Sequence, residues 1–503
     1  MPIDPRTPVI VGVGQLTRRP RGEDAASLNE PLELMAAALE IAAQDASGVI
    51  GRRSALLERL DELTAISGWV WQPPDPAGAV ARALGISPGA TRIAGAGGTL
   101  PQTLLFDAAQ RISEGSIDVA AVVGAEATRS REVARRQGER RSWHEQPAGT
   151  APAAVVGAPP DPLTPHERAV GLAVPVFTYA LFESAMRRSR GLDRAAHAES
   201  IGRLAERMAL VAAGNEMAWI RDAPSAAQIS TPGDRNRMVA TPYTKLLTSN
   251  VRVDMGAAFI IASYEAARAA GVPEDRLVFP HRGTRAYEQW FVSHRADLSA
   301  SLAMRACATE LFGDGARGAS AVAHLDLYSC FPVVVQMAGA AMGLDVWADP
   351  RPPTVTGGLT FFGGPGNNYV THSIATMADR LRGDPGSLGL VTALGWYAST
   401  HAWGTYSTRP PGVPFRLDDV QAAVDAEPLR AADDDYEGEG EVEAYTVVHD
   451  RDGAASRAIV SLLTPAGARR LAATEDPGAA ADIEAADPLG ARALVEEGSV
   501  RLP

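Results

Sequence analysis

The sequence predicts an α/β protein made of two similar layered halves, with an inserted segment in the first half and a small β-rich domain at the C-terminal end. Three observations lead to this fold class. Short apolar runs alternate with helical patterns along most of the chain. A glycine-rich loop followed by a helix and an apolar strand occurs twice. After Pro414 the pattern changes to short strands with an excess of acidic residues.

The first half begins with PVIVGVGQ at residues 8–15, an apolar run typical of a buried strand. A helix follows, for which Asn29 is the expected N-cap and Pro31 stands in the first turn. We expect further strands at 63–70, 91–94 and 117–126, helices at 78–84 and 101–115, and a loop, GAGG, at 95–98. Strands this apolar, alternating with helices, indicate a mostly parallel sheet covered on both faces.

The second half repeats this pattern after Asp254. The expected helices are 256–270, 298–312 and 333–342, with strands near residue 277 and at 324–328. Its last unit is a glycine-rich loop at 357–366, a helix through 372–381 and a strand at 388–398. Because the order of loop, helix and strand matches that of residues 95–126, we infer an internal duplication.

The predicted domains follow from these patterns. Residues 1–127 and 241–265 form the first half, 128–240 a loop domain, 266–413 the second half and 414–503 an acidic β-rich domain. The loop domain is polar, contains many prolines and is too long for a simple crossover connection. In the last domain an acidic loop at 433–441 precedes strands at 444–450 and 455–463, which the turn signal Asp452–Gly453 joins.

Charge and cysteine content exclude several classes of function. The formal net charge is −13, and residues 415–503 hold 20 acidic against 8 basic residues, which disfavours a general nucleic-acid binder. Neither an unbroken apolar run of membrane-spanning length nor a basic leader is visible, so we expect a cytoplasmic protein without a membrane span. Two cysteines and nine histidines, without metal-ligand spacing, predict no metal site. Motifs for nucleotide hydrolysis, serine hydrolysis and zinc proteolysis do not occur.

The strongest chemical signal is the pair of glycine-rich loops, each of which opens a helix. Helix N-termini present unpaired N–H groups and a partial positive charge, so two of them that converge form a site for an anion or a developing oxyanion. Glycine-rich turns that merely join strands to helices are the alternative. The duplication favours a shared cleft between the halves.

Three segments of the chain resemble the thiolase superfamily. Residues 101–130 are similar to the helix and strand that follow the nucleophilic cysteine of thiolases. YSCFP at 328–332 is similar to the His-Asp-Cys-Phe motif of sterol-carrier-type thiolases, and GGLTFFGGPGNN at 357–368 to Gly-Gly followed by Gly-His-Pro. With its extra C-terminal domain the chain looks most like the mycobacterial type-1 thiolase-like proteins. The resemblance covers roughly residues 8–406 and implies a duplicated, αβαβα-layered thiolase-type core.

The departures from the thiolase pattern concern the reacting groups. Gly98, or its neighbour Gly97, stands where a thiolase holds its acyl-accepting cysteine, and glycine has no atom that can carry an acyl group. Gly364 stands where the resemblance expects the histidine of Gly-His-Pro. Tyr328 and Ser329 replace the His-Asp pair, and Ala393-Leu394-Gly395 replaces Cys-x-Gly. We therefore expect ordinary thiolase activity to be lost.

Some candidate reacting groups remain. Cys330 keeps its place and could act as acid, base or nucleophile if its pKa were lowered, although a buried core cysteine is the alternative. His401 could supply the lost imidazole, or be a hydrogen-bonded loop histidine. Asn367 and Asn368, with His372 after them, could donate to a thioester oxygen or cap the helix.

The resemblance implies coenzyme A (CoA) or an acyl-CoA as ligand, no covalently bound cofactor, and a role in lipid metabolism in an actinobacterial cell. Arginines suit the phosphates of CoA, and two groups stand out, one including Arg135 and Arg136 and the other Arg187, Arg188 and Arg190. A solvated arginine face is the alternative. Lys245 is a third candidate as the single lysine of the chain. The family default is a homodimer, with a monomer as the alternative.

Three functions stay open on the sequence. The first is a protein that binds CoA or acyl-CoA in the cleft without thiolase chemistry. The second is an acyltransferase that uses Cys330 and His401 on a lipid or sterol-derived acyl-CoA. The third is a scaffold or partner-binding subunit, with the acidic C-terminal domain as its docking surface.

Overall fold

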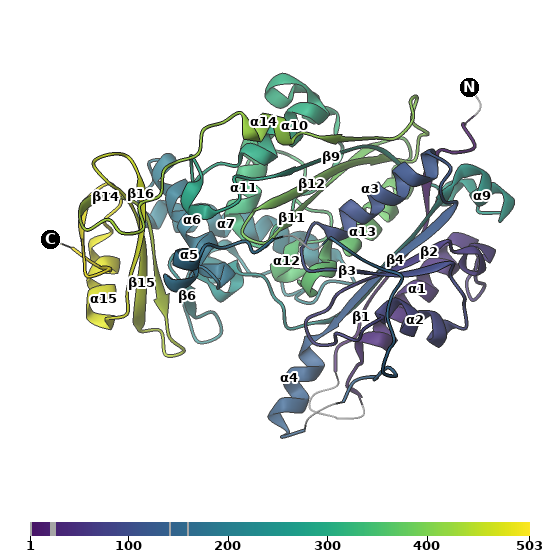
Figure 1. Ribbon diagram of the computed structural model, residues 1–503, viewed down its shortest axis with the longest axis horizontal. Helices are drawn as coiled ribbons and strands as arrows, with labels where there is room; N and C mark the ends of the chain where they lie inside the picture. The colour runs from purple at the N-terminus through teal and green to yellow at the C-terminus, as the bar shows by residue number, and fades with distance from the viewer. Residues whose placement is uncertain (1–2, 21–26, 140–141, 158–159, 503) are drawn as a thin grey trace.

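Five layers make up the body of the computed structural model, which describes residues 3–20, 27–139, 142–157 and 160–502 (Figure 1). Two mixed sheets enclose a central layer of helices, and further helices cover the outer face of each sheet. The yellow C-terminal domain lies at one end, beside the loop domain, and the purple N-terminal strands and helices lie at the other. The layered α/β core expected from the sequence is therefore confirmed.

The first sheet has the strand order β1-β8-β4-β2-β3-β5. Its strands are β1 (Pro8–Thr17), β8 (Asp254–Ser263), β4 (Val119–Ala127), β2 (Glu62–Ile66), β3 (Ala90–Ala94) and β5 (Ala154–Val156). Helices α1 (Pro31–Ser47) and α2 (Pro76–Leu84) pack on its outer face. Val9 and Val11 face these helices while Ile10 joins the inner core, so both faces are buried. Burial on both faces explains the continuous apolar runs.

Three predictions for this sheet and its helices are wrong. The expected helix at 256–270 is strand β8, which pairs antiparallel with β1 and β4, followed by the short helix α9 (Tyr264–Ala269). A short apolar run buried on both faces has no periodicity that separates strand from helix. Asn29 does not cap α1, since its side chain donates to Asp254 Oδ2 at 3.0 Å; the N-cap is Glu30. With β8 between β1 and β4, the sheet is mixed rather than mostly parallel.

The second sheet repeats the pairing of the first. Its order is β10-β11-β12-β9-β13, from β10 (His324–Asp326), β11 (Leu388–Gly395), β12 (Thr400–Ser407), β9 (Phe279–Tyr287) and β13 (Arg416–Asp419). β10 and β11 are parallel, and β12 runs antiparallel to both β11 and β9. In the first sheet β2, β4, β8 and β1 follow the same sequence of one parallel and two antiparallel pairs. The matching topology supports duplication.

Helices α3 (Leu100–Ser113) and α13 (Tyr369–Gly383) form the central layer. Both contact strands of the first and of the second sheet, and they contact one another. Each follows a glycine-rich segment, residues 95–98 for α3 and 357–366 for α13. The start of each central helix therefore faces the junction of the two halves. Helices α10 (Leu302–Phe312) and α11 (Pro332–Ala341) belong to the outer cover of the second sheet.

The loop domain is mostly helical. It contains α4 (Thr128–Arg136), α5 (Pro165–Ala169), α6 (Pro175–Ser189), α7 (Arg194–Gly214) and α8 (Ala226–Ser230), followed by the short strands β6 (Met238–Ala240) and β7 (Tyr243–Thr244). Phe331, at the start of α11, stacks on Tyr179 of α6 at 4.6 Å between ring centroids and on Tyr243 at 5.3 Å. These rings attach the loop domain to the second half.

The C-terminal domain is a β-sheet with one long helix. Its strands β14 (Gly438–His449), β15 (Ala455–Leu463), β16 (Arg469–Thr474), β17 (Arg492–Glu496) and β18 (Ser499–Arg501) accompany α15 (Pro477–Ala486). β15 matches the predicted strand at 455–463, and β14 covers the other predicted strand up to His449 and starts inside the segment expected to be an acidic loop. β14 also pairs with β6 of the loop domain, at Val448 and Ala240. The domain is thus joined to the body by its own sheet.

Candidate functional site

A cavity of about 590 Å³ lies where the two halves meet the loop domain. The first glycine-rich loop contributes Gly97 and Gly98, and the second contributes Gly364 and Asn367. Tyr328, Cys330 and Phe331 enter from the segment after β10, and Trp396 and Tyr397 from the segment after β11. Val174, Val176 and Ser249 of the loop-domain side close the other wall. Both glycine-rich loops therefore meet in one cleft.

Gly98 stands where the surrounding atoms leave no room for a side chain. A Cβ atom on this residue would lie 2.3 Å from the carbonyl oxygen of Leu394 and 2.7 Å from the hydroxyl of Tyr328. Both distances are well inside van der Waals contact. The Tyr328 hydroxyl thus occupies the space in which a nucleophilic side chain on Gly98 would begin, and the two departures from the thiolase pattern are physically coupled.

Asn367 links the two glycine-rich loops directly. Its Oδ1 accepts a hydrogen bond from the backbone N–H of Gly97 at 3.0 Å, and its Nδ2 donates to the carbonyl of Ser67 at 2.9 Å. The predicted amide donor is therefore engaged with protein groups. Asn368 does not line the cavity, because its Nδ2 donates to the carbonyl of Gly124 at 2.7 Å and its Oδ1 accepts from Thr371.

Cys330 lines the cavity with a protonated thiol. Its side chain is only 8 % exposed, and burial raises the pKa of the thiol to about 12. The Tyr179 hydroxyl, which lies beside it, donates to the carbonyl of Trp396 at 2.8 Å. A nucleophilic cysteine needs the thiolate, which this environment disfavours at neutral pH. Catalysis by Cys330 would require a lowered thiol pKa, whereas burial raises it.

His401 lies at the start of β12 and is absent from the lining of this cavity. It lines a second, adjoining cavity instead. Its Nε2 donates to the carbonyl of Ala398 at 2.9 Å, and burial lowers the pKa of the ring to about 4. Cys330 and His401 therefore face different spaces and do not form a nucleophile–base pair. His372 is also buried, with Nδ1 3.1 Å from Gln15 Oε1.

Comparison with known proteins places this geometry in a family. The model of the thiolase-like protein type 1 additional C-terminal domain matches residues 419–499. The structure is similar to a monomeric SCP2-thiolase-like protein type 1 from Mycobacterium smegmatis, with 31 % identity, a TM-score of 0.82 and coverage of 99 % of each chain. The chain belongs to the SCP2-thiolase-like proteins of type 1.

More distant structures share the fold of this thiolase-like protein. The Ltp2-ChsH2(DUF35) aldolase has 19 % identity and a TM-score of 0.59, with coverage of 80 % of this chain and 99 % of that one. An acetyl-CoA acetyltransferase from Syntrophomonas wolfei has 14 % identity and a TM-score of 0.54, with coverage of 81 % and 100 %. No curated protein matches in a sequence search.

The thiolase-like protein also holds a buried carboxyl that sequence reasoning missed. Glu126 lies one residue before the end of the apolar strand β4, is 1 % exposed and accepts from the backbone N–H of Trp69 at 2.5 Å. Its Oε2 has no hydrogen-bond partner among the described residues. Burial raises the pKa of this carboxyl to about 7. A Cβ on Gly366, in the second glycine-rich loop, would lie 2.7 Å from its Oε1, so the carboxyl supports the cavity wall.

The predicted phosphate ligands of the thiolase-like protein are dispersed. Arg135 and Arg136 are exposed on α4, where Arg136 pairs with Glu132 at 2.6 Å, and neither lines the cavity. In the second arginine group, Arg187 donates to Asp487 Oδ2 at 2.8 Å and Arg188 pairs with Glu441, so both are bound to the C-terminal domain.

Arg190 of that group lies 4.0 Å from the centroid of the Trp347 ring, measured from its Cζ. Lys245 is exposed one short turn before Thr248, which lines the cavity. Of the predicted cations named here, Lys245 is the nearest along the chain to a residue of the cavity lining.

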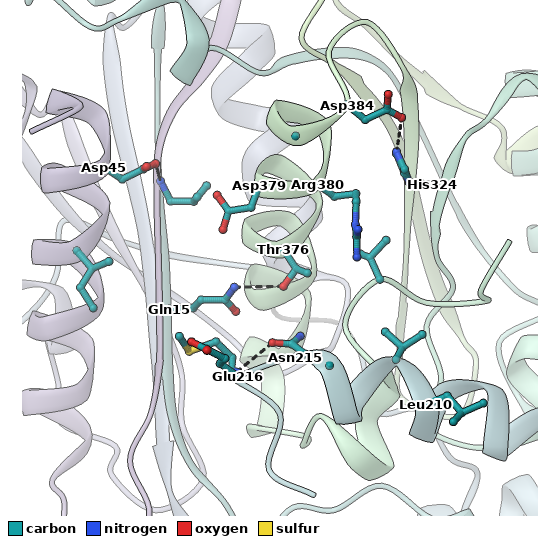
Figure 2. Close-up of a pocket in the computed structure, with 17 residues that line it drawn as sticks. Gln15, Asp45, Leu210, Asn215, Glu216, His324, Thr376, Asp379, Arg380 and Asp384 are labelled. Carbon is teal, nitrogen blue, oxygen red and sulfur yellow. Dashed lines mark hydrogen bonds and ion pairs between the residues drawn. The ribbon is translucent and has the colours of Figure 1, made fainter. Parts of the chain in front are cut away.

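A larger cavity, of about 880 Å³, lies elsewhere in the thiolase-like protein (Figure 2). Strand β1, helix α13 and the end of α7 line it, and Gln15 donates to Thr376 at 3.2 Å across it. Asp45, Glu216, Asp379 and Asp384 outnumber the single arginine of its lining, Arg380. An excess of carboxylates repels phosphates, so this cavity does not suit CoA.

Within the described part of the chain, no group of three or more His, Cys, Asp or Glu side chains is arranged to hold a metal ion. Over the same residues, no helix is long and apolar enough to span a membrane.

Proposed function

We propose that this protein binds CoA or an acyl-CoA in the cavity of about 590 Å³ and does not form the covalent acyl intermediate of thiolases. The observation that carries the proposal is the state of the first glycine-rich loop. It meets the second loop in one cleft, yet Leu394 and Tyr328 exclude a side chain from Gly98. A cleft without a nucleophile supports binding without acyl transfer to the protein.

The composition of the walls supports a thioester ligand. Val174, Val176 and Phe331 make much of the lining apolar, as a pantetheine arm and an acyl chain require. Lys245 is exposed and close in sequence to Thr248 of the lining, which makes it our candidate for contact with a phosphate of CoA in solvent. The arginines on α4 and α6 are not needed for this mode of binding.

The other two functions have less support. An acyltransferase built on Cys330 and His401 would need a thiolate and a shared cavity, and the thiol is protonated while the imidazole faces a different space. A scaffold with a free C-terminal docking domain fits poorly with strand β14 pairing to β6 and with the pairing of Arg187 to Asp487.

We further infer that the protein is a cytoplasmic monomer. Strand β5 covers β3 and forms the edge of the first sheet itself, and with three residues it offers little backbone for a second copy to pair with. The mycobacterial relative is described as monomeric. Size-exclusion chromatography with light scattering tests the inference, and a stable dimer would contradict it.

Calorimetric titration of the purified protein with CoA and acetyl-CoA tests the binding proposal. Gly364→Phe is the blocking variant, because a Cβ at Gly364 fits without a clash, with its nearest neighbours at 3.6 Å, and this residue lines the cavity that the added ring is meant to block. Leu210→Phe, on the exposed rim of the larger cavity, is the matched control. We expect Gly364→Phe to weaken CoA binding at least tenfold and the control to leave it unchanged.

Two results would overturn parts of this proposal. If the folded wild-type protein binds neither CoA nor acetyl-CoA, the proposed ligand is wrong. Thiolysis of acetoacetyl-CoA, or an acetylated protein detected by mass spectrometry after incubation with acetyl-CoA, would show that a covalent intermediate forms after all.

A further inference from the structure

Tyr328 carries a hydroxyl without a partner in the wall of the proposed CoA cleft. Among the described residues, every other buried tyrosine hydroxyl takes part in a hydrogen bond: those of Tyr179, Tyr243, Tyr369, Tyr397, Tyr406 and Tyr445. Tyr328 bonds through its backbone N–H to Thr392 Oγ1 at 2.8 Å, whereas its hydroxyl has no partner in the described part of the chain. Because a buried tyrosine hydroxyl usually finds a partner, this one indicates an acceptor that the chain itself does not supply.

The hydroxyl of Tyr328 is accessible from the cavity. Tyr328 belongs to the cavity lining, and 7 % of its surface remains exposed. Over the described residues, the side-chain atoms that are both sealed and unpartnered include Trp396 Nε1 and His401 Nδ1, but not the oxygen of Tyr328. Since this oxygen has no partner and is not sealed, an acceptor that enters the cavity can reach it.

The ring of Tyr328 is held in place and keeps its proton. It meets the ring of Tyr369 edge to face, with 5.6 Å between the centroids, and Tyr369 is anchored by a bond of 2.7 Å between its hydroxyl and Thr356 Oγ1. Burial raises the pKa of Tyr328 far above its ordinary range. At neutral pH the phenol is therefore a neutral donor in a fixed position.

Other polar groups of the lining are engaged with the protein. Ser249 and Tyr397 donate to backbone carbonyls at 2.9 and 3.0 Å, and the amide of Asn367 is bonded at both ends. These groups need no ligand, in contrast to the hydroxyl of Tyr328. A neutral donor between apolar walls suits an uncharged acceptor such as a carbonyl, because a carboxylate would lose its hydration there.

The depth of Tyr328 indicates which carbonyl of an acyl-CoA meets it. Trp69 and Val174 line the same cavity and are 49 % and 44 % exposed, so they mark its mouth, whereas Tyr328 lies at the buried end. The ADP end of CoA carries the phosphates and stays in solvent beyond the mouth, since burial of these charges is costly. The opposite end of the ligand, which holds the thioester, then lies beside Tyr328.

We propose that the hydroxyl of Tyr328 donates a hydrogen bond to the thioester carbonyl of an acyl-CoA, and that the cleft thereby prefers acyl-CoA to free CoA. Free CoA ends in a thiol and offers no carbonyl at this place. The inference rests on the proposed binding of CoA thioesters in this cavity. It makes Tyr328 a specificity-determining residue that recognises the thioester without accepting its acyl group.

Titration calorimetry with acetyl-CoA and S-ethyl-CoA tests the proposal, because the second ligand is a thioether of the same length without the carbonyl oxygen. The wild-type protein should bind acetyl-CoA about fivefold more tightly, the gain expected for one buried hydrogen bond. Tyr328→Phe removes only the hydroxyl and should bring this ratio to about one. Tyr397→Phe is the matched control, since it removes a hydroxyl of the same lining that already has a protein partner; it should change both affinities together and keep the ratio.

Infrared difference spectra give a second measurement that a purely structural role of Tyr328 would not change. The carbonyl stretch of acetyl-CoA, labelled with ¹³C at the carbonyl, should move to lower frequency in the wild-type complex and move less in Tyr328→Phe. Circular dichroism establishes that the variants are folded. If Tyr328→Phe does not fold, the spectrum of the wild-type complex decides, and an unshifted stretch overturns the inference.

The outcomes separate this inference from the proposed function. Equal affinity of the wild-type protein for acetyl-CoA and S-ethyl-CoA would overturn the role of Tyr328 and leave the binding of CoA intact. A preference for acetyl-CoA that persists in folded Tyr328→Phe would overturn that role as well. If CoA, acetyl-CoA and S-ethyl-CoA all fail to bind, both proposals are wrong.

Discussion

Replacing Gly98 by cysteine restores the nucleophile that the thiolase pattern expects at this position, and we predict that the change destabilises the protein instead of activating it. The new Cβ would lie 2.3 Å from the backbone oxygen of Leu394 and 2.7 Å from the Tyr328 hydroxyl. Tyr328 can move its side chain, but the Leu394 carbonyl belongs to strand β11 and cannot rotate away. Overpacking of this kind costs about 1–3 kcal/mol, and a backbone contact places Gly98→Cys at the upper end.

Urea denaturation followed by circular dichroism measures the loss of unfolding free energy. Gly98→Ala should lose about as much as Gly98→Cys, because the Cβ atom is the cause in both variants. Ala96→Cys is the matched control, since it adds a thiol in the same loop at an exposed position that already has a Cβ. If Gly98→Cys is as stable as the wild type and acetyl-CoA acylates it, the steric account of the missing nucleophile is refuted.

Three further predictions concern buried groups. Burial raises the pKa of Glu126 from 4.5 to about 7, so the folded state binds more protons than the unfolded state between these values. The free energy of unfolding therefore falls by about 3 kcal/mol as pH rises across that interval. Glu126→Gln should abolish this fall in urea titrations at pH 5 and pH 8, and an unchanged fall in the variant would contradict the prediction. Arg469 has no exposed side-chain area and pairs with Glu443 at 2.7 Å. Arg469→Met should therefore lower the free energy of unfolding, measured by urea titration, by about 3–5 kcal/mol, because it leaves the Glu443 charge without its partner. Arg451→Met, at an exposed position, is the control and should change the free energy of unfolding little. Cys330, with a pKa of about 12, should resist iodoacetamide at pH 8 in the native protein and react only after unfolding; rapid native labelling would show an accessible thiolate.

Local pattern was sufficient for much of the fold. Apolar runs bounded by turn signals located β1, β4 and β11, and a helical period located α3. Strand β8 differs from the predicted helix, since MGAAFIIAS has alanines and a continuous apolar character that both helices and strands accept. Its true state depends on the two strands that flank it, β1 and β4, which are distant in sequence.

The candidate site shows the same difference between what local sequence determines and what distant contacts determine. Residue identity alone determined that Gly98 offers no acyl acceptor and that a Gly-His-Pro histidine is missing, because chemistry of this kind is a property of the side chain. Which groups face one another is a property of the packed halves. Tertiary structure decided that Tyr328 occupies the space beside Gly98, and that His401 faces a separate cavity. It also decided that Cys330 stays protonated and Glu126 titrates near neutrality, since burial and the neighbours of a group set its pKa and neither is written in local sequence.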